Sequence, residues 1–211
     1  MPIYNSVYWG SKMIGLEAIK NMVRQQGGIV KTADFVKLGM YNSDVIRLMK
    51  NHVLEKVRHG YYTLFETNEP NEASIIARLF PDAILNMDTA LFHYGYSDRT
   101  PLAWTLALNR TVSTSRLHLE YPHIKPYLID KKYLDVGVQE IQIQGVAMRI
   151  YDRERVICDC FKYRNKIDSE MFSKAIQAYI SDEKKNLRRL SEYARQLRVY
   201  KKIQEVMGVW F

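Results

Sequence analysis

Residues 41–64 read YNSDVIRLMKNHVLEKVRHGYYTL, and this stretch decides the fold of the N-terminal part of the chain. Its first half carries apolar residues at the spacing of one helix face, which predicts a helix over 43–52. In its second half, apolar and polar residues alternate over 54–58, which predicts a strand. His59-Gly60 predicts a turn and 61–64 a return strand, so the two strands would form a hairpin. The apolar stripe of the predicted helix is Val45, Leu48 and Met49.

Two more helices are predicted upstream, over 13–26 and 33–38, with a short extended stretch at Ile29-Val30 between them. Small polar residues open helices, and glycine ends them because it adopts the left-handed conformation at little cost. The residues expected to begin or end the three helices are Ser11, Gly27 and Gly28, then Thr32 and Gly39, then Asn42 or Ser43.

This order of elements, three helices with a tight glycine turn and then a hairpin, is that of a winged helix-turn-helix. We therefore predict that residues 1–66 form such a domain and bind double-stranded DNA, with the third helix in the major groove. The residues predicted to contact DNA are polar or cationic and lie on the free face of that helix, at helix starts or at the hairpin tip: Thr32, Tyr41, Asn42, Ser43, Arg47, Lys50, Arg58 and His59. The alternative is a protein-interaction module with merely solvated cations.

The charge of the chain is unevenly distributed. The net charge is +8 over 211 residues; residues 1–66 hold 9 Lys and Arg against 5 Asp and Glu, and residues 166–211 hold 10 against 6. The 99 residues between them are neutral, with 12 of each sign. Basic ends around a neutral middle favour a nucleic-acid partner.

No targeting or membrane signal is evident in the sequence. The N-terminus lacks a basic start followed by an apolar core, and there is no apolar run of about 18 residues. Two cysteines separated by one residue do not form a disulfide framework. We expect a cytoplasmic protein without a membrane partner.

The remainder, residues 72–211, is predicted to be a mixed α/β domain that ends in helices, which makes the whole chain α+β. A hinge is expected at 67–71, and 118–125 is expected to be a loop or an edge strand because of its prolines. The predicted strands are 102–109, 111–115, 138–143 and 146–151; the predicted helices are 72–80, 89–94, 153–163, 169–180 and 183–206.

This part of the chain shows no catalytic pattern. There is no phosphate-binding glycine loop and no nucleophile motif, and Cys158 and Cys160 are expected to be buried core thiols because helix residues two apart diverge. We therefore predict no enzyme activity, no metal and no cofactor. The alternative, a metal nuclease, would use the carboxylates of Asp135, Glu140, Asp152 and Glu154.

The string YDRERVICDCF at 151–161, followed by KYR, resembles the AbiEi family, the antitoxins of type IV abortive-infection toxin–antitoxin systems of bacteria. The resemblance extends to the GGIV segment at 27–30 and the RHGYY segment at 58–62. It implies a repressor of its own operon that binds inverted repeats in promoter DNA. It also implies a C-terminal domain that counters a nucleotidyltransferase toxin without needing a stable complex, in the setting of phage defence.

The motif residues Asp152, Glu154 and Arg155 also have a structural interpretation, which we favour: a network at a helix start, with acids near the positive end of the helix dipole and paired with arginines. A competing function is that of a stand-alone regulator whose C-terminal domain senses a ligand.

The last predicted helix carries more cations than its packing stripe requires. Most such faces are only solvated, and the alternative is a second surface for phosphates or RNA. The residues of this possible second basic surface are Lys184, Lys185, Arg188, Arg189 and Arg195.

Overall fold

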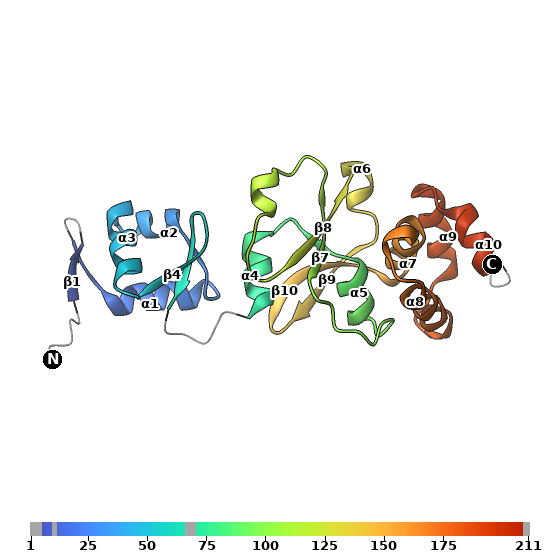
Figure 1. Cartoon of the computed structure of the whole chain (residues 1–211), viewed down its shortest axis with the longest axis horizontal. Helices are drawn as coiled ribbons and strands as arrows, with labels where there is room; N and C mark the ends of the chain where they lie inside the picture. Colours follow the sequence, from blue (N-terminus) through green and yellow to red (C-terminus); the bar gives the residue numbers. More distant parts are fainter. Residues whose placement is uncertain (1–5, 10–11, 66–70, 209–211) are drawn as a thin grey trace. The chain divides into compact units, whose positions relative to one another are not determined.

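The chain is a mixed α+β protein, and the computed structural model describes residues 6–9, 12–65 and 71–208 (Figure 1). It consists of two compact units. Unit 1 is Met1–Phe80 with Leu119–Pro122, and unit 2 is Pro81–His118 with His123–Phe211. Residues 67–70 of the predicted hinge lie outside the described residues. Within the described part, no helix is both long and apolar enough to cross a membrane.

Unit 1 has two small sheets and four helices among its described residues. Strand β1 pairs with β2 in an antiparallel hairpin, and β3, β5 and β4 form an antiparallel sheet in that order. The elements are β1 (Ser6–Trp9), β2 (Lys12–Gly15), α1 (Leu16–Gln25), β3 (Val30–Lys31), α2 (Thr32–Lys37), α3 (Asn42–Lys50), β4 (Leu54–Arg58), β5 (Tyr61–Leu64) and α4 (Glu72–Leu79).

The start of the first helix differs from the prediction. Met13 and Ile14 belong to strand β2, and α1 begins three residues later than expected, at Leu16 after the extended residue Gly15. The backbone of 12–15 pairs with Ser6–Trp9, and this pairing overrides the helical periodicity of the sequence. Ser11, the predicted cap, lies outside the described residues.

The expected caps of α2 and α3 are also wrong. Lys31, not Thr32, precedes α2, and Tyr41, not Asn42 or Ser43, precedes α3. In each case an aspartate three residues later accepts the N–H of the residue before the helix, at 2.9 Å for Asp34 and 2.8 Å for Asp44. The aspartate in the first turn therefore satisfies the free N–H of the residue that precedes the helix. This hydrogen bond is one of the two that make up a capping box.

The core of unit 1 draws on α1, α2, α3 and the β4–β5 hairpin. The rings of Phe35 and Tyr62 meet edge to face, with centroids 5.8 Å apart. The buried members are Ile19, Val23, Val30, Phe35, Met40, Val45, Leu48, Leu54, Tyr62 and Leu64. Because the three helices and the hairpin all contribute, their mutual arrangement is fixed by one apolar cluster.

Unit 2 is built on a five-stranded mixed sheet of order β8-β7-β6-β10-β9. Strands β7 and β8 are parallel, as are β6 and β10, whereas β6–β7 and β9–β10 are antiparallel. The edge strand β8 accommodates Pro126. The strands are β6 (Ile84–Leu85), β7 (Trp104–Asn109), β8 (Ile124–Ile129), β9 (Val138–Ile143) and β10 (Val146–Tyr151).

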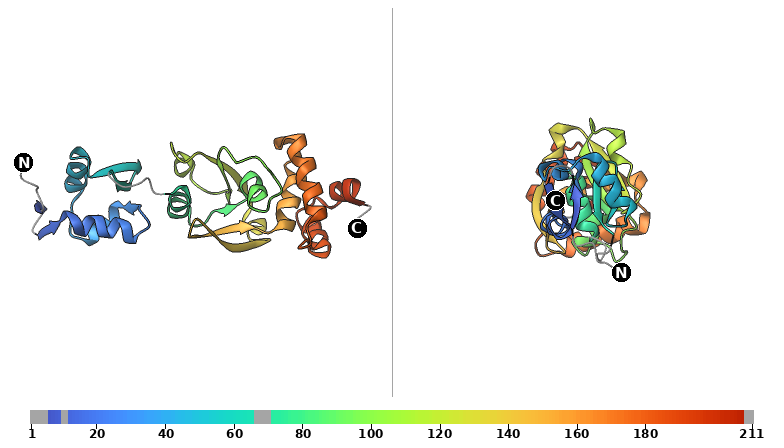
Figure 2. Two further views of the ribbon diagram at one scale, coloured as in Figure 1. Left: turned by 90° about the horizontal axis from the view of Figure 1, so that it is seen from below. Right: turned by 90° about the vertical axis from the view of Figure 1, so that its left-hand side faces the viewer.

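The helices of unit 2 are organised around α7. Eight consecutive residues of it, Glu154 to Phe161, are buried, and it packs against α5, α8, α9 and α10. Helices α7 to α10 gather at one end of the sheet (Figure 2). The helices are α5 (Met87–His93), α6 (Lys131–Leu134), α7 (Arg153–Lys162), α8 (Ser169–Ser181), α9 (Leu187–Gln196) and α10 (Tyr200–Met207).

Two predicted elements of unit 2 are wrong. Residues 111–115 form a turn that leads into a 3-10 helix at Thr114–Leu117 instead of a strand. The side chain of Asn109 accepts the N–H of Thr111 at 3.1 Å, so the backbone turns where a strand would continue. The predicted helix 183–206 is two helices, α9 and α10, broken at Arg198, whose φ is +62°.

Candidate nucleic-acid interface

Helix α3 has one buried face and one polar, solvent-exposed face. The buried face consists of Asp44, Val45 and Leu48, with Met49 half-buried. Val45 and Leu48 anchor the helix in the core of unit 1. The exposed residues are Asn42, Ser43, Ile46, Arg47 and Lys50. A helix fixed along one side with donors and cations along the other has the form that a major groove accepts.

The predicted contact residues on α3 lie together on this exposed face. Tyr41, immediately before the helix, is 66% exposed. Arg47 keeps its side chain about half-exposed while one guanidinium nitrogen, Nη2, lies 3.3 Å from Asp44 Oδ1. Because Asp44 is held by the Tyr41 N–H and is buried, it orients Arg47 from below the surface.

Of the two hairpin residues predicted to contact DNA, His59 is exposed and Arg58 is half-buried. His59 is exposed at the turn, where Gly60 has a φ of +77°. Arg58 is half-buried, and its guanidinium carbon lies 4.7 Å from the ring centre of Tyr61 and 5.7 Å from that of Phe80. This stacking fixes the direction of Arg58.

Thr32, predicted to contact DNA from a helix start, instead makes its hydrogen bonds to the turn of the hairpin. It is half-buried, and its Oγ1 donates to the carbonyl of Gly60 at 3.4 Å, while its own N–H donates to the same carbonyl at 3.0 Å. Thr32 therefore ties the start of α2 to the turn of the hairpin, and it holds the two elements together.

Helix α2 holds a buried carboxylate, Asp34, that the sequence analysis did not single out. Asp34 accepts the Lys31 N–H and lies 3.3 Å from Lys37 Nζ and 3.0 Å from Arg78 Nη2, and it is only 6% exposed. Burial acts to raise its pKa, but the backbone hydrogen bond and the two cations outweigh burial and lower it. The sequence does carry a local signal for this role: an aspartate is the third residue of both α2 and α3, at Asp34 and Asp44.

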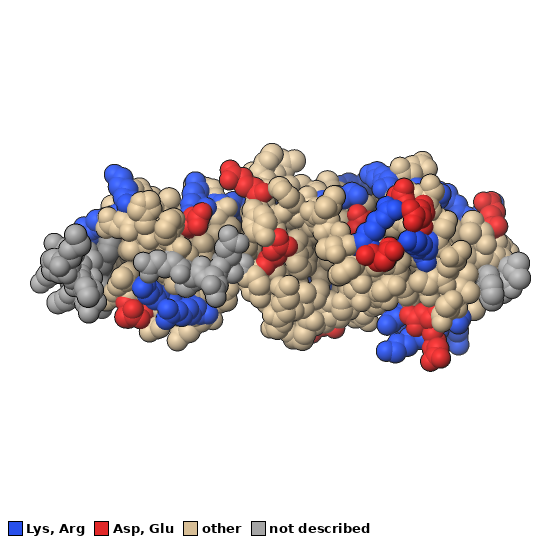
Figure 3. Space-filling model, turned by 60° about the horizontal axis from the view of Figure 1, so that its bottom comes forward, with Lys and Arg blue, Asp and Glu red and all other residues tan. Residues whose placement is uncertain are grey.

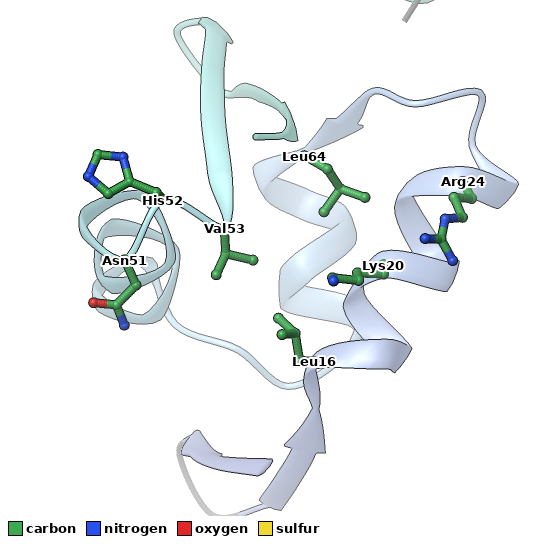
Figure 4. A pocket seen from close by; sticks show the side chains of 7 residues that line it. All are labelled: Leu16, Lys20, Arg24, Asn51, His52, Val53 and Leu64. Carbon is green, nitrogen blue, oxygen red and sulfur yellow. The ribbon is translucent and has the colours of Figure 1, made fainter. Parts of the chain in front are cut away.

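A small hollow lies between α1 and the segment after α3 (Figure 4). Its volume is about 160 Å³, and Leu16, Lys20, Val53 and Leu64 point into it, while His52 turns away at its rim. The remaining lining residues are Arg24 and Asn51. None of the predicted DNA-contact residues lines it.

In unit 2 the motif acids form a buried network at the start of α7. Asp152 accepts the N–H of Arg155 at 2.8 Å and the Tyr193 hydroxyl at 3.2 Å. Glu154 accepts the Asn186 N–H at 2.8 Å and the Tyr179 hydroxyl at 3.3 Å. Asp152 is 8% exposed and Glu154 2%, so their contacts are internal to unit 2.

Arg155 is fully buried and joins α7 to the segment before β9. Its Nη1 donates to the carbonyls of Tyr133 and Val136 at 2.6 and 2.8 Å, and its Nε donates to Asp159 at 3.1 Å. Burial raises the pKa of Asp159 even though Arg155 opposes the shift. These contacts hold the fold together, and they leave no surface at which a partner molecule meets Arg155.

The two cysteines lie within α7 and are buried. Burial raises the pKa of both thiols well above the ordinary value, so they are poor nucleophiles. Within the described residues no three His, Cys, Asp or Glu side chains lie close enough to hold a metal ion.

The possible second basic surface is largely engaged in contacts within unit 2. Blue and red side chains lie next to one another over the C-terminal helices in Figure 3. Arg188 lies 3.1 Å from Glu192, Arg189 lies 3.9 Å from Asp152, and Arg195 stacks 4.5 Å from the ring centre of Tyr200. Lys185 donates to the carbonyl of Asp182 at 3.3 Å, and Lys184 is exposed.

Comparison with known proteins identifies a related fold and no family. No protein-family model matches the sequence, and neither does any curated protein. The structure is similar to the crystal structure of Rv2827c from Mycobacterium tuberculosis, with a TM-score of 0.52 and 11% sequence identity over 90% of this chain and 79% of that one. At this identity the likeness concerns the fold alone.

Proposed function

We propose that unit 1 acts as a winged helix-turn-helix that binds promoter DNA at inverted repeats and represses its own operon. The observation that carries the proposal is α3: its inner face is locked into the core, and its outer face presents Asn42, Ser43, Arg47 and Lys50. Asn and Arg are suited to bidentate contacts with adenine and guanine, and Lys and Ser to phosphates.

The hairpin after α3 supports the same proposal. It follows α3 directly, as a wing does, and its turn presents His59 beside the stacked Arg58. A cation at this place would contact the DNA backbone or the minor groove next to the groove that α3 occupies. Thr32 would act indirectly, by holding the hairpin turn against α2.

The test is the affinity of the full chain for the DNA upstream of its own gene. Fluorescence anisotropy should show binding at least tenfold tighter to a duplex with the inverted repeat than to a shuffled duplex of the same composition. Specific sites commonly exceed non-specific DNA by more than that. Equal affinity for the two duplexes would mean that unit 1 is not a sequence-specific DNA-binding module.

We further propose that the rest of the chain supplies an antitoxin activity against a nucleotidyltransferase toxin. The support is the likeness of 151–161 to the AbiEi family, together with the place of that segment at the centre of unit 2. Since Asp152, Glu154 and Arg155 are buried, they would maintain the fold of this unit, and exposed residues would carry out the neutralisation.

Co-expression with a nucleotidyltransferase encoded beside the gene tests the antitoxin proposal. Growth should be restored by the full chain, and a co-purified complex is not required. If a toxic nucleotidyltransferase is encoded there and the full chain gives no rescue, the antitoxin assignment is wrong, while the DNA-binding proposal stands or falls by its own assay.

A further inference from the structure

Ile46 is an apolar residue in the middle of the polar face of α3. It is 49% exposed, although α3 has a fully buried side at Val45 and Leu48 that accommodates apolar groups. Its neighbours one helical turn away are Asn42 and Lys50, both exposed. The core of unit 1 therefore does not explain an isoleucine here.

Isolated exposed apolar residues are common on protein surfaces, so exposure alone carries no meaning. The position of Ile46 is what matters. It lies between the side chains that the proposed function directs into the major groove, where it cannot donate or accept a hydrogen bond. In that groove the one apolar group that distinguishes a base pair is the C5-methyl of thymine.

We propose that Ile46 reads a thymine methyl group, so that the operator carries thymine at the position facing the middle of α3. This inference rests on the proposed DNA binding of unit 1. Asn42 and Lys50 would then contact bases or phosphates on either side of that thymine, one helical turn before and after Ile46. Burial of one methyl group predicts a preference of about fourfold for thymine over a base without the methyl.

Replacement of thymine by deoxyuridine tests the contact, because it removes the methyl and keeps the base pair and its hydrogen-bonding groups. The full chain would first select its preferred site from randomised duplexes. Each thymine of that site is then replaced in turn, and the affinity is measured for the wild type and for Ile46→Ala. Val36→Ala is the matched control, since Val36 is also β-branched, lies on α2 and is 61% exposed.

We expect one position in each half-site of the inverted repeat at which deoxyuridine weakens wild-type binding about fourfold. Ile46→Ala should bind both duplexes of that pair equally, and Val36→Ala should keep the wild-type ratio. Selective binding without a methyl-dependent position, or a ratio that survives in Ile46→Ala, overturns this inference alone. Failure to select any site overturns the proposed function and this inference with it. Circular dichroism melting of Ile46→Ala should match the wild type, as expected for an exposed side chain.

Discussion

Among the described glycines of unit 2, Gly137 is the one at which a side chain would meet the closest contacts. Its φ is +76°, and a Cβ there would lie 2.6 Å from Arg155 Cβ and 3.0 Å from Asp152 Oδ1. Its carbonyl also accepts the N–H of Asp152 at 2.6 Å. Gly137→Ala should therefore lower the free energy of unfolding by about 3 kcal/mol, the sum of overpacking and left-handed strain.

Gly145 offers the matched control for this substitution. Its φ is +79°, and a Cβ there would meet no atom of the described residues within 4 Å beyond its chain neighbours. Gly145→Ala should cost only the left-handed conformation, about 1 kcal/mol. Urea denaturation of both variants measures the difference, and equal destabilisation would show that the contact with Arg155 does not constrain the fold.

Asp34 makes the stability of unit 1 depend on pH in a definite direction. Its pKa in the folded chain lies below the ordinary value of 3.8, so its stabilisation is complete above that pH and is lost as the pH falls through the folded pKa. Asp34→Asn should lower the free energy of unfolding by about 1–3 kcal/mol at neutral pH, since hydrogen bonds to charged groups are lost. At a pH below the folded pKa of Asp34, the variant and the wild type should converge.

Asp98→Asn serves as the control, because Asp98 pairs with Lys174 at 3.0 Å on an exposed surface. Its effect should be small at every pH. A destabilisation by Asp34→Asn that stays constant down to the acid limit would contradict the assigned role of the Asp34 charge.

At the scale of elements, five helices end in the same way. In α1, α2, α3, α5 and α9 the third residue past the helix donates its N–H to a carbonyl five residues back, for example Val199 to Ala194 at 2.8 Å. This is the Schellman motif, which requires a left-handed residue before that donor. The left-handed residues are Gly27, Gly39, His52, Gly95 and Arg198.

This shared motif explains how far the sequence predicts the helices. Where the left-handed residue is glycine, at Gly27, Gly39 and Gly95, the helix end is evident from the sequence. Where it is His52 or Arg198, no glycine marks the end, and the prediction runs too far. The break at Arg198 is instead imposed by packing, because Val199 and Ile203 are both buried in unit 2.

Arg198→Gly should stabilise the chain for this reason. Glycine removes the left-handed penalty of about 1 kcal/mol, partly offset by the greater freedom of glycine in the unfolded chain, so a gain of up to about 0.5 kcal/mol is expected. Arg198→Ala keeps the penalty and should leave stability within about 0.5 kcal/mol of the wild type. Thermal melting decides between them; a loss of stability in Arg198→Gly would argue against this account of the break.

The exposure of the candidate DNA-contact residues could be predicted from the sequence only where it follows from the spacing of residues within one helix. Helical periodicity alone places Asn42, Ser43, Arg47 and Lys50 opposite the buried stripe, and the structure exposes all four. Thr32 and Arg58 are half-buried and contact residues distant in sequence: Thr32 bonds to Gly60, and Arg58 stacks on Phe80 as well as on the nearby Tyr61. Contacts of that kind have no local sequence signal.

At the scale of the whole molecule, the chain divides into two compact units, and this predicts separable activities. The predicted domains are 1–66 and 72–211, which puts α4 in the second domain. In the structure α4 belongs to unit 1. Arg78 of α4 donates to Asp34 and to Gln26. Any fragment should therefore retain α4 with the N-terminal elements if unit 1 is to keep these bonds.

Separation is best tested in the full chain. The double variant Arg47→Ala/Lys50→Ala removes two exposed cations of α3 and no core residue. It should lose repression of a promoter reporter by tenfold or more and still rescue cells from the toxin. Loss of both activities in a chain that melts like the wild type would mean that unit 1 takes part in neutralisation.

The salt dependence of promoter binding tests the central claim, that the exposed face of α3 holds DNA, most directly. Each phosphate contact contributes about 0.9 to the slope of log affinity against log salt. The control is Lys201→Ala/Lys202→Ala, which removes the same charge from two exposed residues of unit 2. Arg47→Ala/Lys50→Ala should weaken binding at least tenfold and lower the slope by about 1 to 2, and the control should keep wild-type values. If both double variants lower affinity and slope equally, or neither does, α3 is not the DNA-binding element.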